Sequence, residues 1–159
     1  MTGLHSGLQA LSPLLGRWAG RGSGTYPTIE PFDYLEEVAF SHVGKPFLAY
    51  RQNTTAGDGI PLHAETGYVR VPQPGHVELV LAHPSGITEI EVGTYSVSEG
   101  VIEIELTASS IGLTPSAKQV TALGRRLRID GDELSYSVQM SAVGQPLQNH
   151  LAAVLHRQS

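Results

Sequence analysis

The feature that most constrains the fold is a series of short segments in which apolar and polar residues alternate, each ending near a Gly or Pro. The clearest segment is residues 134–140, where every second residue is apolar: Leu134, Tyr136, Val138 and Met140. Because successive side chains of a β-strand point to opposite faces, this pattern predicts a half-buried strand. With 18 Gly and 10 Pro as breaks, the sequence predicts an all-β sandwich or barrel.

About ten such segments follow one another along the chain. Residues 98–100 (Ser-Glu-Gly) and 130–132 (Asp-Gly-Asp) are turn sequences that join two of them to the preceding segment, so neighbouring strands are expected to be antiparallel. An even number of up-and-down strands closes naturally into a barrel without exposed edges. The expected strands are residues 19–26, 34–42, 47–55, 63–71, 76–82, 88–97, 101–107, 118–129, 134–140 and 146–155.

Residues 4–15 differ from the rest, because Leu8, Leu11, Leu14 and Leu15 recur at spacings of three and four. This spacing predicts a short N-terminal helix that plugs one end of the barrel. The 159 residues show no break in composition and no internal repeat, so we expect one domain covering residues 1–159.

The C-terminal segment, residues 147–156, is ambiguous, because its apolar residues suit a helical face as well as a strand. If the segment is a strand, strict alternation places His150, Ala152 and Val154 on one face. His150 would then share its face with small and apolar residues only.

Charge and composition exclude several classes of protein. Lys and Arg total 10 against 15 Asp and Glu, and no basic block is present, so nucleic acid and anionic membranes are not expected partners. Apolar runs are short and no basic flank precedes an apolar stretch, so we predict a cytoplasmic protein without a membrane helix or signal peptide. The absence of Cys excludes disulfides, iron–sulfur clusters and thiolate ligation of haem.

Histidine offers the main candidates for chemistry. Two of the seven are expected to be buried: His63 opens a strand, and His150 lies within an apolar stretch. From the residues alone, a structural histidine is favoured over a metal ligand at both positions. No pair has a zinc-type spacing, so a multi-histidine metal site is not expected. The others lie near turns or termini and are expected to be solvated: His5, His42, His76, His83 and His156.

Other motifs give no support for common enzyme classes. No Gly-x-Ser-x-Gly elbow occurs, and residues 20–24 are not a dinucleotide-binding loop because no βα unit surrounds them. Four glutamates alternate on two predicted strands and are expected to form the outer, solvated face of the barrel: Glu89, Glu91, Glu103 and Glu105.

Residues 16–28 begin with a Gly-x-Trp-x-Gly-x-Gly motif, made by Gly16, Trp18, Gly20 and Gly22, and resemble the nitrobindins. The tryptophan suits a strand that closes one barrel end, while the glycines let backbone approach on the other face. Residues 31–37, 41–46, 61–68 and 146–151 are similar to nitrobindin in the same order, so the resemblance covers nearly the whole chain.

The resemblance implies a ten-stranded antiparallel barrel that holds one haem b. It makes His150, in the Leu-Gln-Asn-His-Leu stretch, the proximal iron ligand, and it places Thr28 and Lys118 near the haem periphery. The residues expected around the distal pocket are Leu62, His63, Met140, Phe32 and Val138.

The resemblance also implies a function, namely binding of nitric oxide and isomerisation of peroxynitrite to nitrate by the ferric protein inside a dry pocket. If His63 points away from the iron, the pocket lacks an acid for peroxide cleavage, and peroxidase activity should be poor. A homodimer is compatible with the sequence.

Two other classes stay open. A lipocalin-like carrier of a fatty acid or other apolar molecule would hold its ligand with an interior Arg and Tyr. Arg125, Arg126 and Arg128 cover both faces of their strand, so the sequence places no such pair inside. A structural module without a cofactor is the other alternative.

Overall fold

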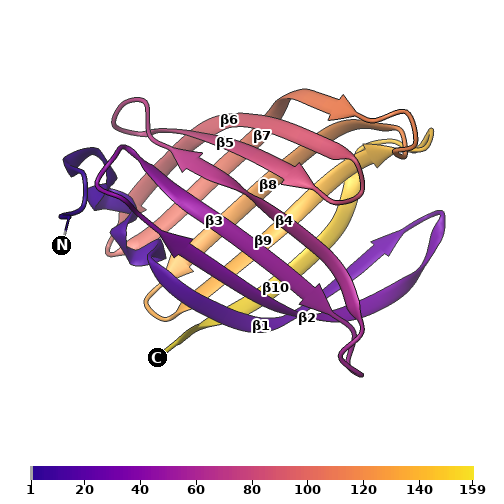
Figure 1. Cartoon of the computed structure of the whole chain (residues 1–159), viewed down its shortest axis with the longest axis horizontal. Coiled ribbons are helices and arrows are strands. Elements are labelled where there is room, and N and C mark those ends of the chain that lie inside the picture. The colour runs from indigo at the N-terminus through magenta and orange to yellow at the C-terminus, as the bar shows by residue number, and fades with distance from the viewer. Residues whose placement is uncertain (1) are drawn as a thin grey trace.

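The computed structural model describes residues 2–159, which form a closed barrel of ten antiparallel strands (Figure 1). Each strand pairs with its neighbours in the sequence, and β1 pairs with β10 to close the barrel. The predicted up-and-down barrel is confirmed. The strands are β1 (Gly16–Tyr26), β2 (Ile29–Ser41), β3 (Phe47–Thr55), β4 (Pro61–Arg70), β5 (His76–His83), β6 (Ile87–Ser98), β7 (Val101–Leu113), β8 (Val120–Asp130), β9 (Glu133–Ala142) and β10 (Gln148–Gln158).

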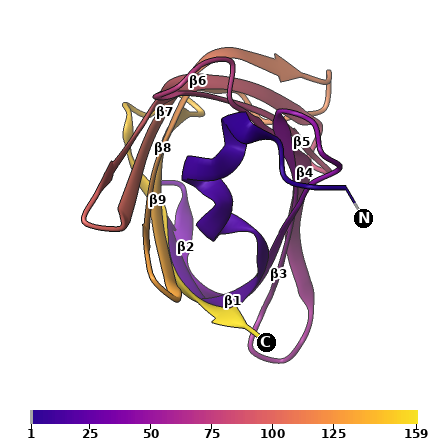
Figure 2. The ribbon, with the colours of Figure 1, turned by 90° about the vertical axis from the view of Figure 1, so that its left-hand side faces the viewer.

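The two ends of the barrel differ. A 3₁₀ helix, η1 (Ser6–Leu14), lies across one end, which we call the closed end (Figure 2). The turns β1–β2, β3–β4, β5–β6, β7–β8 and β9–β10 lie at the other end, which we call the mouth. The β1–β2 hairpin projects there, at the right of Figure 1. In residues 2–159 no helix has the length and apolar character needed to cross a membrane.

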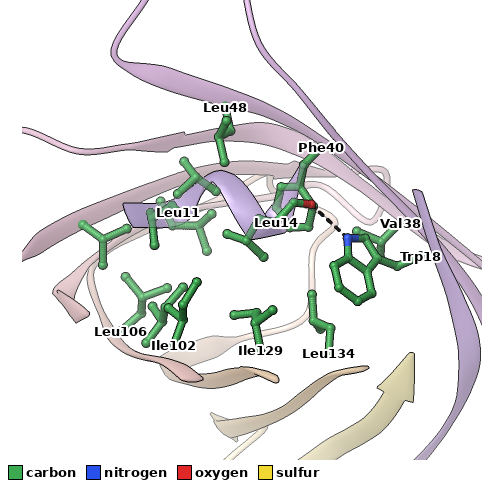
Figure 3. Close-up of a cluster of buried hydrophobic side chains, with 14 of the residues drawn as sticks. Leu11, Leu14, Trp18, Val38, Phe40, Leu48, Ile102, Leu106, Ile129 and Leu134 are labelled. Carbon is green, nitrogen blue, oxygen red and sulfur yellow. Dashed lines mark hydrogen bonds between the residues drawn. The ribbon is translucent and has the colours of Figure 1, made fainter. Parts of the chain in front are cut away.

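The helix confirms the predicted plug. Leu8, Leu11 and Leu14 are at most 1% exposed, because a 3₁₀ helix brings every third residue to the same side. Leu15 falls just after the helix and is only half-buried. The Trp18 indole N–H donates to the Leu14 carbonyl at 2.9 Å, which ties the end of η1 to β1 (Figure 3). Trp18 therefore closes this end of the barrel, as predicted.

The glycines of the motif lie on the same inward face of β1 as Trp18, not on the opposite face. A side chain at Gly20 would overlap the Val154 carbonyl of β10, and one at Gly22 would overlap the Tyr34 ring. The prediction of close approach is thus correct, but the predicted face is wrong, because positions two apart on a strand share a face. Gly16 begins the strand with φ of +115°, a conformation that L-residues rarely adopt.

The C-terminal segment is a strand, which settles its ambiguity. Leu151, Ala153 and Leu155 point inward, whereas Ala152 and Val154 are exposed. Asn149 pairs with Gln139 and Leu151 pairs with Val138 on β9, so His150 is the extra residue of a β-bulge. The bulge breaks strict alternation, and the prediction that His150 shares a face with Ala152 and Val154 is wrong.

The barrel interior has three levels from the closed end to the mouth. An apolar cluster around η1 fills the closed end, with Leu48, Ile102, Ile129, Leu134 and Leu155 among its members (Figure 3). About halfway along the strands lies a polar layer of Glu36, Gln52, Glu65, Glu89, Glu91 and Arg125. A second apolar cluster, the mouth cluster, consists of Tyr26, Val120, Leu123, Val138 and Ala142.

Candidate haem site

The β-bulge places His150 beside the mouth cluster. Its ring lies 5.5 Å from the Tyr26 ring, edge to face with an interplanar angle of 78°. His150 Nδ1 is 3.1 Å from the Thr25 carbonyl oxygen. Because a carbonyl can only accept, Nδ1 carries the proton and Nε2 keeps its lone pair. This is the arrangement that orients a histidine ligand to iron, with the second nitrogen anchored on backbone.

The charge state of His150 also suits a metal ligand. Burial lowers the pKa of the imidazole, and although the Thr25 carbonyl opposes this, the positive charge of Lys118 adds to it. The side chain is therefore neutral at neutral pH, as ligation to iron requires. Lys118 lies in the exposed β7–β8 loop, at the same end of the barrel as His150.

The predicted site residues fall into two groups at the mouth. Val138 is buried in the mouth cluster, Met140 packs against that cluster, and both lie on β9 beside β10. Thr28 is exposed in the β1–β2 turn. Phe32 is half-buried and packs on Tyr34, 6.0 Å between ring centroids.

Leu62 and His63 belong to the second group, on β4. In the closed strand order β4 lies across the barrel from β9 and β10, which carry His150 and Met140. Leu62 is 48% exposed and its side chain points away from the interior. His63 points inward. Its Nε2 lies 3.0 Å from Nδ1 of His83, so the two imidazoles are hydrogen-bonded to each other.

The residues at the mouth fit a haem. A flat apolar group needs an apolar wall, an axial ligand with a free lone pair and a cation near the rim for its carboxylates. The mouth cluster supplies the wall, His150 the ligand, and Lys118 the cation.

The prediction that Glu89 and Glu91 form the solvated face is wrong, whereas Glu103 and Glu105 are exposed as predicted. Glu89 is 1% exposed and Glu91 is 0% exposed, and both point into the barrel. Their apolar neighbours on β6, Ile90 and Val92, face outward instead, at 44% and 45% exposure. Glu89 and Glu91 face inward because the barrel interior holds a guanidinium, and a buried cation needs carboxylates around it.

That guanidinium is Arg125 on β8. It donates to Glu65 at 3.0 Å, to Glu89 at 2.5 Å and to Glu91 at 2.9 Å. Burial opposes ionisation of Glu65 and Glu89, but Arg125 together with neighbouring donors, among them Tyr50 for Glu65 and His83 for Glu89, outweighs it and lowers both pKa values. Burial and the neighbouring Glu89 raise the pKa of Glu91, which therefore keeps its proton. Arg126 and Arg128 face outward, so the three arginines do cover both faces of their strand.

A second part of the polar layer surrounds Glu36. The Tyr136 hydroxyl donates to one carboxyl oxygen at 2.6 Å and Gln52 Nε2 to the other at 2.8 Å. Tyr136 is in turn 2.8 Å from the Tyr34 hydroxyl. Burial raises the pKa of Glu36 to about 7, although both hydrogen bonds oppose the shift.

Glu36→Gln should remove part of the pH dependence of stability. A pKa of about 7 in the folded state lies above the value of about 4.3 in an unfolded chain. The folded protein thus holds a proton that the unfolded chain has lost, so Glu36 makes stability fall as the pH rises through this window. Gln does not titrate, and the variant should be more stable than the parent at pH 8.

Urea unfolding of the haem-free protein at pH 5 and pH 8 measures the effect. Glu37→Gln is the matched control, because Glu37 is the exposed neighbour on the same strand. An unchanged difference between the two pH values in Glu36→Gln would contradict the assignment.

His83, predicted to be a solvated turn residue, is also part of the polar layer. Its side chain is only 8% exposed, and its Nε2 lies 2.7 Å from Glu89. Alternation along β6 places Glu89 on the outer face, so the sequence does not predict this contact, although the two residues are only six apart in the β5–β6 hairpin. Alternation along residues 120–130 puts Arg125 on the other face of the strand from Arg126 and Arg128, and this is the signal for an inward-facing arginine.

Comparison with known proteins identifies the family. The family described as THAP4-like, heme-binding beta-barrel domain matches residues 7–157. "Peroxynitrite isomerase 1" of Mycolicibacterium paratuberculosis is 77% identical over 158 residues, which cover 99% of this chain and 98% of that protein. "Peroxynitrite isomerase 1" of Mycobacterium tuberculosis is 74% identical and covers 98% and 97% of the two chains.

A solved structure has the same fold as this chain. The crystal structure of Rv2717c from M. tuberculosis superposes with a TM-score of 0.97 at 73% sequence identity, covering 99% of this chain and all of that one. The resemblance to nitrobindin is therefore confirmed, and so is haem as the cofactor. The chain belongs to the THAP4-like, haem-binding β-barrel family.

Proposed function

We propose that this protein is a haem-dependent peroxynitrite isomerase that also binds nitric oxide, with His150 as the proximal ligand of haem b. The observation that carries the proposal is the His150 imidazole, anchored through Nδ1 on the Thr25 carbonyl and beside an apolar cluster at the mouth. The names of relatives that are 74–77% identical support the reaction.

Each part of the mouth has a separate task. The Thr25 carbonyl holds the ring of His150 in one orientation and keeps the proton on Nδ1. The mouth cluster excludes water, so reactive species meet fewer competing reductants. Lys118 and Thr28 are the residues that we place at the haem propionates. Between the mouth and the apolar cluster around η1 lies the polar layer, in which Arg125 binds Glu65 and Tyr136 binds Glu36.

When bound, ferric haem would supply the iron chemistry that isomerises peroxynitrite to nitrate. The protein offers little help for a peroxidase reaction, which needs a free acid near the iron. His63, the predicted candidate, is held by His83 on the far side of the mouth. This arrangement favours nitrogen oxide chemistry, because it needs less proton transfer.

A fatty-acid carrier is less well supported. An interior arginine does exist, but Arg125 and Tyr50 both already bind the carboxylate of Glu65. The cavity next to Arg125 has a volume of about 50 Å³, whereas pockets for small molecules measure roughly 300 Å³ or more. A larger hollow of about 490 Å³ lies along β6 to β9 and is bordered by exposed charges such as Glu105 and Arg126.

Stopped-flow decay of peroxynitrite tests the function. The ferric protein should accelerate the decay in proportion to its concentration, whereas the haem-free protein should not. Cyanide should inhibit the reaction, because it is a strong ligand of ferric iron and would compete with peroxynitrite. If the ferric protein speeds the decay no more than the haem-free protein does, the protein is a nitric oxide carrier or sensor instead.

Lys118→Glu should release haem severalfold faster at low ionic strength. The substitution replaces attraction of a propionate by repulsion, and because Lys118 is exposed, salt should screen most of the difference. Transfer of haem to an apo-globin acceptor, followed at low and high salt, gives the rates. Equal rates for variant and parent at low salt would remove Lys118 from the site.

A further inference from the structure

Three metal-binding atoms that the haem site does not use converge on the far side of the mouth. His63 Nε2 and His83 Nδ1 are 3.0 Å apart, His83 Nδ1 and Glu65 Oε2 are 3.4 Å apart, and His63 Nε2 and Glu65 Oε2 are 3.9 Å apart. The residues come from β4 and β5, which are adjacent strands (Figure 1). Two imidazoles and one carboxylate are a known ligand set for transition metals.

We propose that His63, His83 and Glu65 form a zinc site with a water as the fourth ligand. In a tetrahedral site with bond lengths of about 2.0 to 2.1 Å, ligand atoms are about 3.3 Å apart. The three separations here bracket that value. Three protein ligands with one open position are typical of catalytic zinc sites, whereas structural sites use four.

The hydrogen bond between His83 and Glu89 leaves the lone pair of His83 on the nitrogen that would bind the metal. Glu89 Oε1 lies 2.7 Å from His83 Nε2 and can only accept, so that nitrogen carries the proton. The lone pair of His83 therefore lies on Nδ1, the atom that faces His63 and Glu65. A carboxylate behind a histidine ligand is the usual partner that fixes its orientation in zinc sites.

Hydrogen bonds also fix the orientation of the Glu65 carboxylate. Tyr50 donates to its Oε1 at 2.7 Å, and Arg125 donates to both of its oxygens, at 3.0 and 3.3 Å. A carboxylate oxygen has two lone pairs, so Oε2 can accept from Arg125 and still bind a metal. Because Glu91 keeps its proton, the carboxylates of Glu65 and Glu89 face the single guanidinium of Arg125, and the one remaining negative charge attracts a cation.

The three proposed ligands differ in exposure, and the most exposed one would let zinc reach the site. The side chains of His83 and Glu65 are 8% and 4% exposed, whereas that of His63 is 37% exposed. The site is therefore open to solvent on the His63 side, where the fourth ligand would lie. In the absence of metal, His63 Nε2 donates to His83 Nδ1. When the metal binds, His63 changes tautomer: Nε2 gives up its proton, Nδ1 takes one from solvent, and the ring stays neutral.

Zinc binding to the haem-loaded protein tests the proposal, because haem keeps His150 occupied and unable to bind zinc. Protein stripped with a chelator is dialysed against zinc chloride, and the bound zinc is measured by mass spectrometry. We expect one zinc per chain. His63→Ala and His83→Ala should each weaken zinc binding about 100-fold, and Glu89→Gln should weaken it about 10- to 100-fold.

His76→Ala is the matched control, because His76 is an exposed histidine at the other end of β5. It should bind zinc like the parent, and all variants should keep the Soret band, which separates this test from the haem assignment. If His83→Ala does not fold, His63→Ala decides, because that side chain is partly exposed. Zinc affinity equal to the parent in His63→Ala, or no stoichiometric zinc in the parent, would overturn the proposal.

Discussion

His150→Ala should lose stoichiometric haem binding while the barrel stays folded. The side chain supplies the bond between protein and iron, and a partner that merely orients such a ligand is already worth 10- to 100-fold in affinity. Removal of the ligand itself should therefore weaken haem binding about 100-fold or more. The imidazole is half-buried and makes one hydrogen bond, to Thr25, so the unfolding midpoint of the haem-free protein should change little.

Titration of the haem-free protein with hemin, followed by the Soret absorbance, measures the loss. His156→Ala is the matched control, because His156 is an exposed histidine on the same strand and should bind haem like the parent. Full affinity in His150→Ala would assign the iron to another histidine.

Arg125→Leu should destabilise the fold by about 3–5 kcal/mol, because it leaves the carboxylates of Glu65 and Glu89 buried without their cation. The loss should depend on pH. In the parent, Arg125 lowers both pKa values, so its contribution to stability is present at neutral pH and is lost as the pH falls. Without Arg125, burial raises these pKa values, and the variant should recover stability relative to the parent in acid.

Arg126→Leu is the control for this change. Arg126 is the next residue on β8, its side chain is 74% exposed, and it pairs with Glu105, which is 64% exposed. An exposed pair of this kind contributes at most about 1 kcal/mol. Urea unfolding at neutral and acid pH compares the two variants. Equal stability of Arg125→Leu and Arg126→Leu at neutral pH would mean that the polar layer does not depend on its arginine.

The strands and their order could be predicted from the sequence, because alternation and turn residues are local signals. β3 has the predicted bounds, and β9 and β5 differ from prediction by at most two residues at either end. The plug was predictable for the same reason, since the leucines of η1 recur at a helical spacing.

The polar layer could not be predicted in this way. Alternation assigns the inner face to the more apolar side of a strand, and on β6 this rule selects Ile90 and Val92 over Glu89 and Glu91. The actual choice depends on Arg125, which lies 34 and 36 residues further along the chain. Similarly, the orientation of His150 depends on a β-bulge, whose position no local pattern marks.

The most direct measurement of the central claim is the nitrate formed from peroxynitrite by the ferric parent and by His150→Ala at equal total haem. The parent and His156→Ala should raise the yield of nitrate and suppress nitration of added tyrosine. His150→Ala should do neither beyond what free hemin does at the same concentration, because its haem is not held at the mouth. A nitrate yield from His150→Ala equal to that of the parent would contradict the account.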